Sequence, residues 1–184
     1  MVEAAASYGM TALAITDRDG LYGAVKHIGA CIAVGISPIV GVSLEVTDDL
    51  GEKLARVVIL ARGRDGGIGW ATLCSIVSAA HGYDVTKVDD RKQKLQRNKS
   101  NRIAIRRGEL ARIIAESLGG CTVLLGNDSD VGQSVLANSR EEALALLQPW
   151  LDLFAVPNTL AVEVATLLTE PTTEGSILQA GRML

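Results

Sequence analysis

The stretch LAITDRDGLYGAVKHIGACIAVGISPIVGVSLEV, residues 13–46, decides the fold class, because two strand-like segments in it flank a helix-like one. Residues 11–16 and 36–46 are short apolar runs typical of buried strands. Between them, apolar residues recur at steps of three and four, which predicts a helix that ends at Gly35. The expected inward face of this helix consists of Leu21, Val25, Ile28 and Ile32. A strand, a helix and a strand in succession predict parallel pairing across a helical crossover.

The rest of the chain continues this alternation, with one direct strand-to-strand step. An Ala-rich opening predicts a helix over residues 2–8 without a capping residue before it, which suggests that an upstream part is missing. The further expected elements are strands at 54–61, 119–126 and 159–168, and helices at 70–81, 107–118, 139–154 and 173–184. The inward positions expected in the helix at 107–118 include Leu110 and Leu118. This order predicts an α/β fold.

Composition supports one globular domain of 184 residues. Hydrophobic residues make up 48% of the chain but aromatic residues only 3%, so aliphatic side chains must build the core. The three cysteines are far apart and lie in apolar contexts, which favours buried, reduced thiols in a cytoplasmic protein. The N-terminus has no signal-peptide pattern and the apolar runs are too short to span a membrane.

The charge is unevenly distributed. The net charge is −3, yet residues 87–107 alone carry a local charge of +7. We expect a basic, flexible loop at about residues 84–106. It contains no aromatic residue for base stacking, so a solvated loop and a contact with DNA phosphates are equally good interpretations. The candidate phosphate-binding residues are Arg91, Lys92, Lys94 and Arg97.

Candidate functional residues lie just after the first strand, where parallel α/β folds gather their sites. Asp17 and Asp19 could bind a metal ion, and His81 is a further candidate ligand. Arg18, between the two carboxylates, competes for their charge, so an ion pair or a helix cap at Asp19 is the structural alternative. His27 is expected to face solvent.

Other chemistries have little support in this sequence. There is no GxSxG or HExxH motif, and GRDGGIG, residues 63–69, lacks the lysine and hydroxyl residue of a phosphate-binding P-loop. No CxxC pair is present.

The quoted stretch, above all TDRDGLYGAVK, resembles the PHP (polymerase and histidinol phosphatase) domain of bacterial DNA polymerase III alpha subunits, of the DnaE type and the error-prone type. The segments RVVILARGRDGGIGWATLCSIVSAAH, GGCTVLLG and LAVEVATLLTEPTTEGSILQAGRML extend the resemblance over nearly the whole chain apart from the basic loop. It implies a distorted (β/α)7 barrel, here incomplete because the first and last strands are missing, so that residues 1–184 form a partial domain.

The same resemblance implies a metal cluster of Mg, Mn or Zn in active family members, and this chain departs from its ligand set. Arg18 stands where the family has a histidine, and Ser43 where it has a glutamate. The family's first and last metal-binding motifs would lie outside the chain. We therefore expect a degenerate metal site at Asp17, Asp19 and His81, with no bound cofactor and no catalytic residue.

Three functions follow as hypotheses. The first is a fragment of a DnaE-type polymerase alpha subunit, acting in DNA replication or translesion synthesis, in which the PHP domain is an inactive structural scaffold. Its partners would be the rest of the alpha subunit, replisome components and DNA, without a membrane. The second is a metal-dependent phosphoesterase or 3′–5′ exonuclease. The third is a nucleic-acid or protein binding module that uses the basic loop.

Overall fold

The computed structural model describes residues 1–48, 50–63, 67–82 and 103–164. The helices are α1 (Val2–Ser7), α2 (Ala24–Val34), α3 (Ile68–Ala80), α4 (Arg107–Glu116), α5 (Asp130–Leu136) and α6 (Arg140–Leu153). The strands are β1 (Ala12–Arg18), β2 (Ser37–Thr47), β3 (Lys53–Ala61), β4 (Ala104–Arg106), β5 (Cys121–Leu125) and β6 (Leu160–Val162). The alternation expected from the sequence is therefore present.

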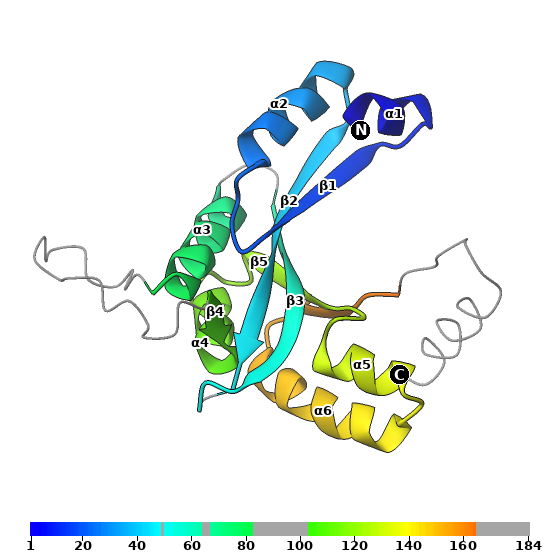
Figure 1. The fold of residues 1–184 in the computed structure, drawn as a ribbon. Helices are drawn as coiled ribbons and strands as arrows, with labels where there is room; N and C mark the ends of the chain where they lie inside the picture. Colours follow the sequence, from blue (N-terminus) through cyan, green and yellow to red (C-terminus); the bar gives the residue numbers. More distant parts are fainter. Residues whose placement is uncertain (49, 64–66, 83–102, 165–184) are drawn as a thin grey trace, which may run out of the picture.

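The six strands of the described residues form one mixed sheet, in which five follow the order β1-β2-β3-β5-β6 and β4 pairs with β2 outside this order. β2 is parallel to β1, while β3 runs antiparallel to both of its neighbours, β2 and β5. β4 pairs with β2 beyond the end of β1, so the long strand β2 has two parallel partners one after the other along the same edge. Figure 1 shows how strongly the sheet twists between β1 and β6.

The α/β class is confirmed, but the (β/α)7 barrel is not. Within the described ranges the sheet is open, because β1 and β6 lie at its two ends without pairing with each other. The two antiparallel pairings of β3 also depart from the all-parallel arrangement that β-α alternation predicts. The cause is the direct turn between β2 and β3, which reverses the chain without a helical crossover.

Side chains alternate between two faces along the central strands. One set is buried, and we call it the covered face: Val42, Leu44, Val46, Ala55, Val57, Ile59, Cys121, Val123 and Leu125. The intervening set, the open face, is only partly buried: Ser43, Glu45, Arg56, Val58, Leu60, Thr122 and Leu124. The covered face belongs to the main core, to which α3, α4 and α6 contribute buried residues such as Leu73, Leu110 and Trp150.

The first β-α-β unit forms as expected, but the inward face of α2 was predicted only in part. Gly35 ends the helix in the left-handed conformation, at φ 77°. Val25 and Ile32, expected inside, are 76% and 67% exposed. The buried residues of α2 are Ala24, His27 and Cys31. Leu21 and Ile28, also expected inside, are partly buried and pack against the main core, so the observed inward face overlaps the predicted one in part.

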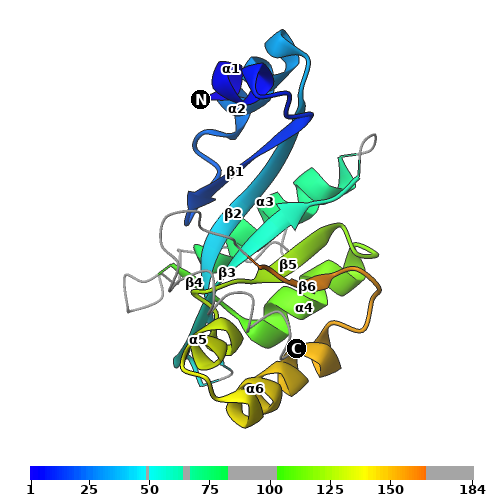
Figure 2. The same ribbon diagram turned by 90° about the vertical axis from the view of Figure 1, so that its right-hand side faces the viewer.

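The N-terminal part of the molecule has a small core of its own. Ala5 of α1, Cys31 of α2 and Ile36 form a buried cluster separate from the main core. In Figure 2, α1, α2 and the first half of β1 lie together at one end of the molecule, away from α5 and α6. This end, residues 1–36, is called the N-terminal arm below.

A tight turn joins β2 to β3. The Asp48 carboxylate accepts hydrogen bonds from the main-chain N–H groups of Leu50 and Glu52, at 2.9 and 2.8 Å. The Asp48 N–H donates to the Glu52 carbonyl at 2.9 Å, and Gly51 supplies the positive φ of 88°. This local closure sets the register of the hairpin.

The second half differs from the sequence prediction in three places. The end of the predicted basic loop forms β4, whose Ile105 is 1% exposed in the core. Leu118, expected inside, is 89% exposed because α4 ends at Glu116. Helix α5 was not predicted, although Ser129 caps it by accepting a hydrogen bond from Gly132 N–H at 2.9 Å. The predicted helix 173–184 and the end of the strand 159–168 lie outside the described residues.

Candidate functional site

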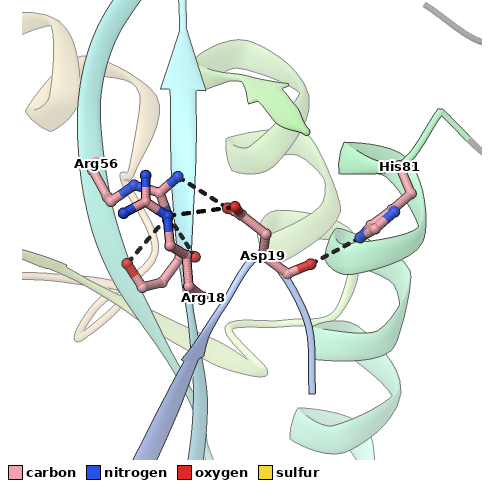
Figure 3. A network of polar contacts seen from close by, with 5 residues as sticks. Arg18, Asp19, Arg56 and His81 are labelled. Atoms are coloured by element: carbon pink, nitrogen blue, oxygen red, sulfur yellow. Dashed lines mark hydrogen bonds and ion pairs between the residues drawn. The ribbon is translucent and has the colours of Figure 1, made fainter. Parts of the chain in front are cut away.

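Asp19 lies directly after β1 and is fixed through its main chain. Its φ of 60° is in the left-handed region, which aspartate tolerates better than most residues. Its N–H donates to the Ser43 carbonyl of β2 at 2.9 Å. Its own carbonyl accepts a hydrogen bond from His81 Nε2, just after α3, at 2.8 Å. The strand end is thus tied to both β2 and the end of α3; Figure 3 shows the contact with His81.

Two guanidinium groups flank the Asp19 carboxylate. Arg56 Nη2 lies 3.0 Å from Oδ1, and Arg18 Nε lies 3.6 Å from Oδ2 (Figure 3). The Asp19 and Arg56 side chains are only 24% and 13% exposed, whereas the Arg18 side chain is 74% exposed. The Arg56 contact is therefore the shorter and better shielded of the two, and Arg18 contributes a solvated ion pair.

Arg56 joins three parts of the structure. Its Nη1 donates to the carbonyl of Ser43 at 2.9 Å and lies 3.4 Å from the hydroxyl of the same residue. Its main-chain N–H donates to the Asp128 carbonyl, in the loop before α5, at 3.1 Å. The sequence analysis did not single out Arg56. The available signal was a cation in the middle of the apolar run KLARVVILA, residues 53–61.

Asp19 does not cap α2 as expected: the N-cap residue is Gly23, and it is the Asp17 side chain that contacts it. Asp17 Oδ2 accepts a hydrogen bond from the Gly23 N–H, at the start of α2, at 2.6 Å. His27, expected to face solvent, is 5% exposed, and its Nε2 lies 2.9 Å from the Leu13 carbonyl. Both side chains hold α2 against β1 and are corrections to the sequence interpretation.

The expected ligand set does not fit a divalent cation. His81 Nε2 must carry a proton, since a carbonyl oxygen only accepts, so this nitrogen has no lone pair for a metal. The Asp19 carboxylate faces guanidinium groups, which would repel a cation. Ser43 offers a hydroxyl where a carboxylate would bind a divalent ion better. Among the described residues, no group of three or more His, Cys, Asp or Glu side chains is arranged to hold a metal ion.

A hollow on the open face adjoins this network. It is lined by Ser43, Arg56, Val57, Val58, Gly126, Asn127, Asp128 and Glu163. Its polar side chains come from β2, β3 and the segments around β5 and β6, so distant parts of the sequence meet here. The predicted phosphate-binding residues Arg91, Lys92, Lys94 and Arg97 lie outside the described residues, so that hypothesis stays a prediction. None of the helices in the described ranges is long and apolar enough to cross a membrane.

Comparison with known protein families shows to which family this chain belongs. The family model of the PHP domain matches residues 1–166. The chain belongs to the PHP domain family. This membership agrees with the resemblance of the β1-α2-β2 segment, and it makes the Arg18–Asp19–Arg56 network a feature of a PHP domain.

The similar curated proteins are bacterial polymerases. The DNA polymerase III subunit alpha of Escherichia coli O6:H1 is 43% identical over 82 residues, which cover 44% of this chain and 7% of that protein. The error-prone DNA polymerase of Anaeromyxobacter sp. strain K is 37% identical over 95 residues, covering 51% of this chain and 8% of that protein. The chain therefore matches only a small part of the length of these relatives.

Proposed function

We propose that this PHP domain is a structural scaffold within a polymerase alpha-subunit type of protein, and that ion pairs have replaced the metal site in it. The observation that carries the proposal is the Asp19 carboxylate flanked by Arg56 and Arg18 at 3.0 and 3.6 Å. An arginine side chain is a cation that is covalently attached to the protein. It can therefore hold the carboxylate at the end of β1 without any bound metal ion. The rest of the polymerase and its DNA are the proposed partners.

The network has the properties of a structural device. It joins β1, β2, β3 and the end of α3 through four residues, Asp19, Ser43, Arg56 and His81. Two groups that a metal site would use are already engaged: the Asp19 carboxylate pairs with Arg56 and Arg18, and His81 Nε2 donates to a main-chain carbonyl. The same contacts therefore support a scaffold and count against a phosphoesterase.

Titration calorimetry of the full chain with Mn²⁺ and with Zn²⁺ tests the proposal. We expect no stoichiometric binding at micromolar protein concentration, and no hydrolysis of a chromogenic phosphodiester with either ion. Two variants serve as matched controls: R18H restores one family residue, and R18H/S43E restores two. We expect R18H to remain without metal binding, because Arg56 still occupies the Asp19 carboxylate.

One result would overturn the scaffold proposal. Stoichiometric binding by the unmodified chain, abolished in D19N and accompanied by EDTA-sensitive hydrolysis, would establish the phosphoesterase hypothesis instead.

A further inference from the structure

We draw no further inference here: the strongest candidate, the exposed apolar face that Val25 and Ile32 give to α2 on the N-terminal arm, carries none, because nothing in the described part of the chain shows what covers it.

Discussion

The two faces of the sheet are built on the same strands, yet they differ in almost every property. On β3, Ile59 on the covered face is fully buried under helices, while its neighbour Leu60 on the open face is only partly buried. The covered face carries apolar side chains throughout, and the open face carries the ion-pair network. The comparison shows how this domain can change the chemistry of one face without disturbing the packing that holds the fold.

The difference between the two faces should have its largest effect on stability at two adjacent positions of β3, Ile59 and Leu60. Ile59→Ala should lower the free energy of unfolding by about 2–5 kcal/mol, because it leaves a cavity in the core. Leu60→Ala removes a side chain of the same volume from the open face and should cost less than half as much. Chemical denaturation of both variants measures the difference. Equal losses would mean that the open face is packed as tightly as the covered one.

A smaller effect is expected within the network of the open face. Asp19→Asn removes the charge but keeps a residue that tolerates positive φ, so it isolates the ion pairs from backbone strain. We expect a loss of about 1–3 kcal/mol, since Arg56 would remain mostly buried without its anion. Asp19→Ala should cost more, because it adds the strain. The proposal of a structural network fails if Asp19→Asn is as stable as the parent chain.

The dependence of stability on alkaline pH tests whether the Cys121 thiol of the covered face is buried. Burial raises the pKa of Cys121 from 9.0 to about 12 and raises that of Cys74 as well. Above pH 9 the unfolded chain loses thiol protons that the folded chain keeps, so the stability that these thiols contribute is lost as pH rises.

Between pH 8 and pH 10, ionisation of the Cys121 thiol in the unfolded chain should lower the free energy of unfolding by on the order of 1 kcal/mol. The measurement compares Cys121→Ala with the parent chain at pH 8 and pH 10, since other groups that titrate in this range cancel in the difference. Identical pH dependence of the two proteins would contradict the burial of this thiol.

The smallest effect is expected at Arg18. Because its side chain is 74% exposed and lies 3.6 Å from the Asp19 carboxylate, Arg18→Ala should change stability by no more than about 0.5 kcal/mol. In the sequence analysis, an ion pair of Arg18 with the neighbouring carboxylates was the structural alternative to a metal site. A thermal melt that falls as much for Arg18→Ala as for Asp19→Asn would restore that first interpretation.

Local sequence patterns predicted most of the helices and strands. They did not predict features that depend on how these elements pack against one another. The apolar runs of β2, β3 and β5 and the glycine that ends α2 are local signals, and they were correct. The buried face of α2 was predicted only in part: Leu21 and Ile28 pack against the core as expected, but Val25 is exposed while Ala24 and Cys31 are buried, because the contacts of the helix with other elements decide which side faces inward. The antiparallel course of β3 follows from the direct turn after β2, but its pairing with β5 joins segments far apart in the chain and no local pattern encodes it.

The candidate site shows the same limit. Position at the end of the first strand marked Asp17 and Asp19, and the family resemblance marked Arg18 and Ser43 as substituted positions. The contacts that these residues make, however, also depend on residues far along the chain. Arg56, which holds Asp19 at 3.0 Å, had no motif to mark it. The hydrogen bond from His81 to a main-chain carbonyl also requires the position of α3 relative to β1.

The β2–β3 turn has a consequence for how the chain folds. It closes the only strand pairing between neighbouring segments among the described residues, since β1 and β2 are separated by α2 and the remaining pairs join distant segments. Short loops close at little entropic cost, so this hairpin should be the first part of the sheet to form, and the later strands would add to it. Pulse-labelled hydrogen exchange during refolding would show early protection in β2 and β3 alone. The Asp48 side chain, which takes no part in the ion-pair network, would then govern the speed of folding more than any residue of that network.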